Sequence, residues 1–488
     1  MAPETLLLLT LVVPLAGTVP ILLLDRTPNL REAATLITAV LLFMVNVALA
    51  AQVLDGARPA FVLAGFIPGA PIVLGAEPLG AIFGLIASGL WIVTSVYSIG
   101  YMRGHHEENQ TRFYAFFAIA LASTMGVAYA GNLISLFIFY EALSLSTYPL
   151  VTHHQNEEAR RGGRTYLGIL LTTSIAFFLF GVLWVWHAAG TVAFTPGGVL
   201  GAAAPDAGIV AAMLALFVFG IGKAGVMPFH RWLPAAMVAP TPVSALLHAV
   251  AVVKAGVFSV VKVTYYTFGI DLLRETGSSE FFLWVAAATI LIASVIALRQ
   301  DNLKRRLAYS TVSQLSYIVL AAMLANKLGI VGGALHIASH AFGKITLFFC
   351  AGAIYVAANK TAVSQLKGIG KAMPWTMTFF TIGALSIIGL PPTGGFVSKW
   401  YILLGTFEAG QPLMALVLII STLLSAAYLM PIVYAAFFQA PDASGAPTHG
   451  EAPLPILIAL GASVTLTFAM FVFSEPVLEA AAAVAGGM

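Results

Sequence analysis

Residues 333–349 read GALHIASHAFGKITLFF, and His336, His340 and Lys344 stand four residues apart in this otherwise apolar run. Such a run is typical of a helix that crosses a membrane. A spacing of four places the three side chains within about 80° of one another, in one stripe about 12 Å long. A metal site, a proton relay and a structural cluster of hydrogen bonds would each explain this stripe.

The metal site is the weakest of these interpretations. Lys344 is the next group along the stripe and would repel a cation, and no cysteine or carboxylate lies within reach in the local sequence. Histidine titrates near neutral pH, and a lysine removed from water gives up its proton more readily. We therefore expect no metal and favour proton transfer over purely structural bonding.

The composition of the whole chain supports a membrane protein. Its 488 residues are 60% hydrophobic and 9% charged, whereas soluble proteins carry about 25% charged residues. Cys350 is the only cysteine, which excludes a disulfide and a self-contained iron–sulfur cluster. No Walker loop and no dinucleotide fingerprint after a strand is present. We expect no cofactor, no nucleic-acid partner and no covalent catalysis by this chain itself.

The apolar runs predict an all-α integral membrane protein with about 14 transmembrane helices, at roughly 20 residues per span. The opening MAPETLLLL is acidic rather than basic, so the first run is expected to be a retained span rather than a signal peptide. The expected spans lie near residues 5–24, 33–54, 79–99, 112–130, 132–151, 166–187, 208–229, 240–267, 281–298, 308–325, 329–357, 374–401, 411–437 and 453–474.

Basic residues predict the orientation of these spans. Loops after odd-numbered spans hold most of the 23 Lys and Arg residues. Loops after even-numbered spans hold only Arg58, Lys262, Arg274 and Lys327. Because Lys/Arg-rich loops face the cytoplasm, we expect a multi-pass protein of a bacterial inner membrane with both termini outside.

Eight ionisable residues fall inside predicted spans. A charge at bilayer depth costs about 2.5–3.5 kcal/mol on insertion scales, so such residues require a partner or a function. They are Glu141, Lys223, His248, Lys254, His336, His340, Lys344 and Lys399. A structural ion pair between Glu141 and Lys223 is compatible with a gating role, because a pair that opens and closes can control a proton. Lys399 is either a group that exchanges protons with the exterior or a lysine that extends to the interface.

Two spans contain breaks. The seventh reads FGIGKAGVMPFHRWLP around Lys223, and the twelfth reads IIGLPPTGGFVSKWYILL ahead of Lys399. Proline and glycine interrupt helices, and paired breaks in two halves indicate inverted repeats around an ion pathway. We expect an N-terminal three-helix segment at 1–111, inverted five-helix repeats at 112–267 and 281–437, and a last span at 453–474.

Other polar groups have a simpler interpretation. His153 and His154, beside EEARRGGR, are expected in a solvated cytoplasmic loop, and GHHEENQTR (104–112) is interpreted in the same way.

Four motifs together resemble one family: FIFYEALSLSTYPLV, GKAGVMPFHRWLPAAMVAPTPVSALLHA, HIASHAFGKITLFF and GLPPTGGFVSKW. They resemble the antiporter-like subunits shared by respiratory complex I, membrane-bound hydrogenases and Mrp-type cation/proton antiporters. The resemblance implies 14 spans, two inverted repeats and broken seventh and twelfth helices. It also implies that Glu141 and Lys223 form a gating pair and that Lys399 is the terminal proton-exchange group. The central hydrophilic axis would consist of His248, Lys254, His336, His340 and Lys344.

Within this family, Lys399 in SKW favours a protein like the D-type subunit of Mrp antiporters, whereas PTPVSALLHA is similar to the distal subunit of complex I and to the A-type subunit of Mrp antiporters. The leading hypothesis is therefore a proton-translocating subunit of a multisubunit Mrp-type sodium/proton antiporter. The alternative is a proton-pumping subunit of a complex I-like or hydrogenase-like assembly. A membrane partner for carbon uptake and a structural scaffold remain as further hypotheses. In the first two cases the partners are other membrane subunits, protons, lipid and, for the antiporter, sodium.

Overall fold

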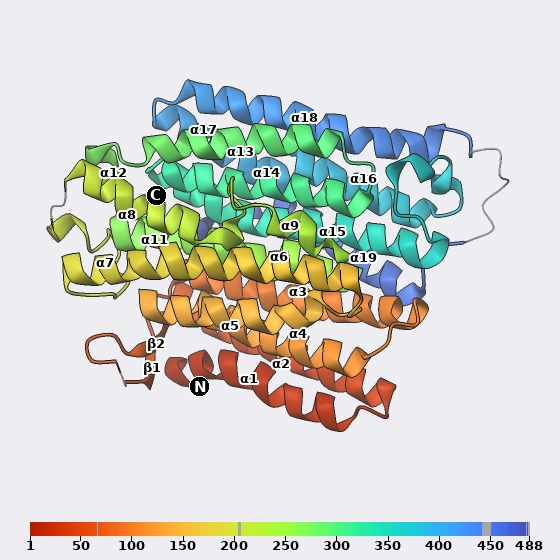
Figure 1. Cartoon of the computed structure of the whole chain (residues 1–488), viewed down its shortest axis with the longest axis horizontal. Coiled ribbons are helices and arrows are strands. Elements are labelled where there is room, and N and C mark those ends of the chain that lie inside the picture. Colours follow the sequence, from red (N-terminus) through yellow and green to blue (C-terminus); the bar gives the residue numbers. More distant parts are fainter. Residues whose placement is uncertain (66, 204–205, 442–449, 485, 487–488) are drawn as a thin grey trace.

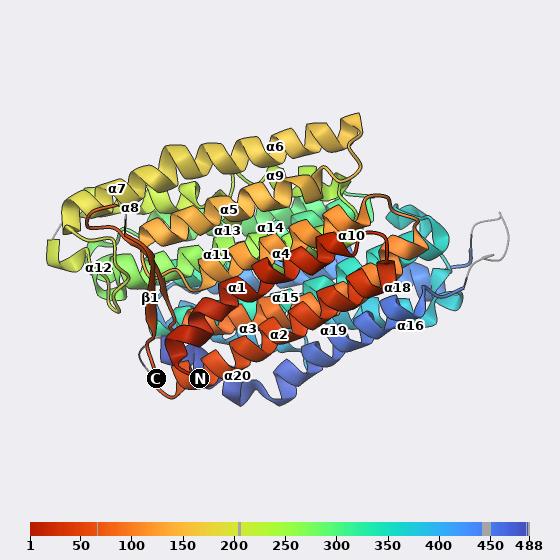
Figure 2. The ribbon, with the colours of Figure 1, turned by 90° about the horizontal axis from the view of Figure 1, so that it is seen from below.

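The computed structural model describes residues 1–65, 67–203, 206–441, 450–484 and 486. Its long helices run side by side along one direction (Figures 1 and 2). The first half consists of α1 (Pro3–Leu23), α2 (Pro28–Leu54), β1 (Ala60–Ala64), β2 (Ile72–Gly75), α3 (Pro78–Gly104), α4 (Gln110–Ala128), α5 (Leu133–Val151), α6 (Glu157–Thr173), α7 (Leu179–Ala189), α8 (Ala207–Gly220), α9 (Trp232–Ala235), α10 (Thr241–Ala245) and α11 (Val252–Val263).

The second half follows the same pattern of long helices joined by short loops. It consists of α12 (Ile270–Thr276), α13 (Glu280–Leu298), α14 (Leu303–Met323), α15 (Lys327–Ala358), α16 (Pro374–Ile388), α17 (Gly394–Glu408), α18 (Pro412–Phe438), α19 (Leu454–Val472) and α20 (Ser474–Val484). Within the described ranges, 11 helices are long and apolar enough to cross a membrane. The expected all-α membrane fold is confirmed.

Three expected spans differ from these 11. The expected span 208–229 corresponds to the shorter apolar helix α8, and 374–401 corresponds to α16 and α17. The span 308–325 corresponds to α14, which has 21 residues but a polar first turn. The two expected breaks are therefore present as real interruptions of the helical backbone.

Glycine conformation explains where the two breaks fall. After α8 a short 3₁₀ turn, Gly222–Ala224, ends at Gly225, whose φ is +69°. After α16 the chain turns at Gly389, whose φ is +91°, before α17 begins at Gly394. Glycine adopts positive φ without the steric cost that a Cβ would bring, so each helix ends at the glycine that the sequence supplies.

Several local expectations need correction. EEARRGGR is not a loop, because α6 already begins at Glu157 with the Asn156 side chain as its N-cap. β1 and β2 form a two-stranded antiparallel hairpin outside the spans, and α20 follows the last span. Such short amphipathic or alternating segments carry a weaker hydropathy signal than the spans themselves.

α15, which contains the stripe at 336–344, is the centre of the bundle. It packs against α3, α10, α11, α14, α16, α17, α19 and α20. Figure 1 shows α1 and α2 along one edge and α18 along the opposite edge. The basic loops lie at the end of the bundle opposite to the end that carries both termini (Figures 1 and 2).

Candidate functional site

Lys223 lies in the break after α8 and is fully buried. Its Nζ donates to the Tyr140 carbonyl at 2.7 Å and to Ser144 Oγ at 2.6 Å, and lies 3.2 Å from the centre of the Tyr140 ring. The Lys223 backbone N–H donates to the Tyr140 hydroxyl at 2.9 Å. α5 thus holds the ammonium through neutral acceptors and an aromatic ring.

Glu141 does not form the ion pair with Lys223 that the family resemblance implies. Among the described residues, neither carboxylate oxygen of Glu141 has a hydrogen-bonding partner, although both are buried. The two residues remain near enough for their charges to interact. In this conformation the two side chains are separated, because the Tyr140 carbonyl and the Ser144 hydroxyl accept from the ammonium instead.

Lys254 and His340 bring α11 and α15 into direct polar contact. Lys254 Nζ lies 2.6 Å from His340 Nδ1, and both residues are buried. One of these two nitrogens must donate and the other accept, so the pair shares a proton position. α11 also joins Lys254 to the first break, since Gly256 packs directly on the Lys223 backbone, where a Cβ at Gly256 would lie 2.6 Å from the Lys223 carbonyl oxygen.

His336 and Lys344 contact two further helices. His336 Nδ1 lies 2.9 Å from Ser398 Oγ on α17, and the His336 ring stacks on Tyr317 with centroids 5.6 Å apart. Lys344 Nζ donates to Ser310 Oγ on α14 at 2.7 Å. The stripe predicted from the sequence is therefore one face of α15 whose three members bond to α17, α11 and α14 in turn.

Lys399 caps the helix that ends at the second break. Its Nζ donates to the carbonyls of Ile387 and Ile388 at 2.9 and 3.0 Å, and lies 4.8 Å from the centre of the Tyr317 ring. The carbonyl end of a helix carries partial negative charge, so α16 stabilises the ammonium. Tyr317 thereby lies between Lys399 and His336.

His248 differs from the four lysines and the two other histidines of this set. It lies in a π-helical turn, Leu246–Val250, and packs against Phe348 with ring centroids 4.9 Å apart. Within the described part of the chain, neither ring nitrogen has a hydrogen-bonding partner, although the residue is fully buried. His340 is near enough to interact electrostatically with His248, Lys254, His336 and Lys344.

A buried ion pair that the sequence reasoning missed joins Glu77 and Lys262. Lys262, expected in a loop, is 1% exposed, and its Nζ donates to Glu77 Oε1 at 2.9 Å and to the Ala130 carbonyl at 2.8 Å. Glu77 also accepts from two backbone N–H groups at the start of α3 and from the Tyr266 hydroxyl. The signal was present, because Lys262 falls inside the expected span 240–267.

The turn between α3 and α4 gathers Glu107 and three histidines that were expected in solvated loops. Glu107 lies 3.1 Å from His105 Nδ1, 3.2 Å from His154 Nε2 and 3.9 Å from His153 Nε2, and its side chain is only 5% exposed. We call these four residues the Glu107 cluster. The two turns fold against each other, and sequence separation concealed this proximity.

The pKa values of Glu107, His153 and His154 in this cluster are shifted by their surroundings. Burial opposes ionisation of Glu107, but the hydrogen bond and charge of His154 outweigh it and lower the pKa of this carboxyl. The same hydrogen bond raises the pKa of His154. Burial lowers the pKa of His153 to about 4, so His153 is neutral near pH 7.

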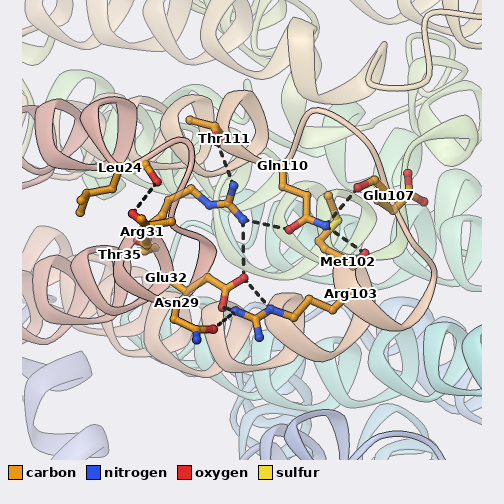
Figure 3. Close-up of polar contacts among 11 residues, drawn as sticks. Leu24, Asn29, Arg31, Glu32, Thr35, Met102, Arg103, Glu107, Gln110 and Thr111 are labelled. Carbon is orange, nitrogen blue, oxygen red and sulfur yellow. Dashed lines mark hydrogen bonds and ion pairs between the residues drawn. The ribbon is translucent and has the colours of Figure 1, made fainter.

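A second polar network fixes the same end of α3 and α4 (Figure 3). Arg31 donates to Thr111 and Gln110, each at 2.9 Å, and Gln110 in turn donates to the Glu107 carbonyl at 3.0 Å. Arg103 forms an ion pair with Glu32. Arg31 and Arg103, expected as loop charges, are instead parts of a network that holds the Glu107 turn.

The arrangement places side chains that can exchange protons along one line through the bundle. Buried amines, imidazoles and hydroxyls extend from Lys223 through Lys254 and His340 to Lys399, and each can donate or accept a proton. Within the described ranges, no group of three or more His, Cys, Asp or Glu residues could hold a metal ion.

Comparisons with known proteins agree with this fold. A model of the family "NADH:quinone oxidoreductase/Mrp antiporter, TM" matches residues 130–425. NADH-quinone oxidoreductase subunit N of Desulforudis audaxviator is 35% identical over 412 residues, which cover 84% of this chain and 81% of that protein. The A/B subunit of a probable K(+)/H(+) antiporter of Rhizobium meliloti is 32% identical over 324 residues, 65% of this chain, but these cover only 31% of that protein.

The fold is also similar to that of a solved complex. A chain in the structure of the Mrp complex from Dietzia sp. matches 100% of this chain and 97% of its own length with a TM-score of 0.88 at 22% identity. The resemblance drawn from the four motifs is thereby confirmed at the level of the family. The chain belongs to the NADH:quinone oxidoreductase/Mrp antiporter transmembrane family, as an antiporter-like subunit.

Proposed function

We propose that this chain carries protons within a multisubunit Mrp-type cation/proton antiporter in a bacterial inner membrane, with both termini outside. The observation that carries the proposal is the buried contact between Lys254 and His340, 2.6 Å apart, at the centre of the line from Lys223 to Lys399. A charge at this depth is energetically costly, so ionisable residues within a membrane span indicate a functional site. The whole-chain likeness to the Mrp complex supports the fold that such a subunit needs.

The eight ionisable residues inside the expected spans would have three roles. Glu141 and Lys223 would gate the first half of the chain, and Lys399 would exchange protons at the second break. His248, Lys254, His336, His340 and Lys344 would form the axis between them. The division into 1–111, 112–267, 281–437 and 453–474 would then separate an N-terminal segment, two inverted repeats and a last span.

The alternative is a proton-pumping subunit of a complex I-like or hydrogenase-like assembly. The 35% identity to an NADH-quinone oxidoreductase subunit N favours it. In that case partner subunits would supply the electron transfer, and this chain would still use the same buried groups.

One purification separates the two proposals. The chain is isolated with its native partners, and flavin and iron–sulfur absorbance would indicate the redox assembly, whereas several small colourless membrane proteins would indicate the antiporter. Transport is then measured in vesicles for Glu141→Ala, Lys223→Ala and Lys399→Ala, with exposed Glu408→Ala as the control. Loss of transport in the first three with normal assembly supports proton carriage, and normal transport in all three contradicts it.

A further inference from the structure

The Glu107 cluster adjoins a cavity that the proposed function has not used. This cavity has a volume of about 520 Å³ and lies at the basic end of the bundle, between the turn after α5 and the starts of α10 and α14. His154 lines both this cavity and a smaller one of about 300 Å³ around Glu107. The cluster therefore stands at the mouth of the larger cavity.

Aromatic side chains join the cluster to the wall of the cavity. The ring of His105 stacks on Tyr101, with centroids 6.0 Å apart, and lies 4.7 Å from that of Tyr355. Both tyrosines line the cavity. The Tyr101 hydroxyl interacts with Thr241, which is the first residue of α10.

The inner wall of the cavity approaches His248. Thr241 precedes His248 by seven residues, which is about 10 Å along a helix. Lys304 also lines the cavity and is near enough to interact electrostatically with Glu107 on one side and with His248 on the other. Neither ring nitrogen of His248 has a partner among the described residues, so His248 is a free proton acceptor at the inner end.

The groups that face Glu107 come from every neighbouring element. A carboxylate that is hydrogen-bonded to an imidazole can share one exchangeable proton with it. The titratable or charged groups at and around this mouth are His105, His106, Glu108, His153, His154, Tyr101, Arg112, Glu158, Lys304, Tyr355 and Lys360.

We propose that the Glu107 cluster collects protons from the aqueous phase at the basic end and delivers them through the cavity to His248. This inference rests on the proposed function, because it names the entry to the same buried path. The proton moves from solvent to the His154–Glu107 pair, then past Lys304 and Thr241 to a nitrogen of His248, with no bond formed other than N–H or O–H. A collecting site matters most when protons are scarce, so its effect grows with pH.

The first test changes the charge of the cluster in the complete assembly. Proton transport is measured in vesicles whose basic end faces the medium, at about pH 6 and about pH 9. The variants are Glu107→Gln and, as the control, Glu157→Gln, whose exposed side chain lines neither cavity. We expect Glu107→Gln to slow transport roughly tenfold at the alkaline pH and less than about twofold at the acid pH, the lower end of what a focused field contributes. Imidazole buffer should restore the alkaline rate, because a mobile carrier replaces the fixed one. Glu157→Gln should match the wild type.

The second test blocks the cavity without changing the cluster. Native Cys350 is fully buried, so a cysteine placed at exposed Thr361 on the cavity wall can be labelled selectively with a bulky maleimide. Transport by Thr361→Cys should fall on labelling, while Lys371→Cys, which is outside the cavity, should be unaffected. The comparison is made on the same folded sample before and after labelling.

The outcomes distinguish the inference from the function beneath it. Unchanged transport in Glu107→Gln at alkaline pH, together with unchanged transport after labelling Thr361→Cys, overturns the inference. A uniform loss in Glu107→Gln at both pH values, without rescue by imidazole, also overturns it, because that is a structural defect. If Lys254→Met still transports protons, the proposed function itself fails.

Discussion

Two buried carboxylate and lysine sets in this protein differ in how completely they are bonded. Glu77 accepts from Lys262, from Tyr266 and from two backbone N–H groups, so its carboxylate is fully satisfied. Glu141 has no hydrogen-bonding partner among the described residues, and Lys223 bonds to neutral oxygens instead.

The difference separates a structural ion pair, Glu77–Lys262, from a set of groups that can change its bonding, Glu141–Lys223. A buried pair with every lone pair occupied gains nothing by moving, whereas an unpartnered carboxylate beside a lysine has a second arrangement available, the closed ion pair. We therefore expect the Glu77–Lys262 pair to hold α3 against α11 and the Glu141–Lys223 set to alternate during transport.

The largest expected effect comes from removing the lysine of the Glu141–Lys223 set. Lys223→Met should abolish proton transport in vesicles, because the ammonium that alternates is gone. Lys223 donates to neutral oxygens of Tyr140 and Ser144, and neither Glu141 oxygen has a hydrogen-bonding partner among the described residues. Lys223→Met therefore breaks no ion pair, and the assembly should remain intact by size-exclusion chromatography. Wild-type transport by a correctly assembled Lys223→Met protein would show that the lysine is structural.

The matching change in the structural pair, Lys262→Met, should lower stability and leave transport unchanged. Lys262→Met leaves Glu77 buried without its cation, which typically costs about 3–5 kcal/mol. The yield and thermal stability of the assembly should fall, while transport per assembled complex stays near the wild-type value.

The double variant Glu77→Gln/Lys262→Met is the control for this prediction. It removes both charges and should recover most of the lost stability, which thermal unfolding of the purified complex would measure. A specific transport rate that falls to background in Lys262→Met, at unchanged stability, would place Lys262 in the proton path and end the distinction.

The two sets also show what sequence reasoning reaches and where it stops. Hydropathy and Gly/Pro pattern locate spans and breaks because those signals are local, and all eight site residues lie in the bundle as expected. Whether Glu141 bonds to Lys223 depends on rotamers and on Tyr140 and Ser144, which the sequence pattern does not contain.

Contacts between segments distant in the sequence were missed for the same reason. Glu77 and Lys262 are 185 residues apart, and Glu107 and His154 are 47 apart. Each pair meets only after helices pack, so no spacing rule could indicate it. The position of Lys262 inside the expected span 240–267 indicates that it is buried, but nothing in the sequence pattern indicates that Glu77 is its partner.

The smallest expected effect concerns the Glu107 cluster, which is neither a fully bonded ion pair like Glu77–Lys262 nor a separated set like Glu141–Lys223. Because the pKa of His154 is raised, its contribution to stability is present below its ordinary pKa and is lost as the pH rises through the raised value. Because the pKa of Glu107 is lowered, its contribution is present above its ordinary pKa and is lost as the pH falls through the lowered value. The pair should therefore stabilise the assembly most between these limits, by no more than about 1 kcal/mol, because the His154 side chain is 35% exposed and water screens its charge. Thermal unfolding of wild type and His154→Ala, with exposed His187→Gln as the control, should differ in that window and converge on its alkaline side. A difference that persists unchanged on the alkaline side would mean that His154 contributes packing rather than charge. The cluster would then be structural, like the Glu77–Lys262 pair.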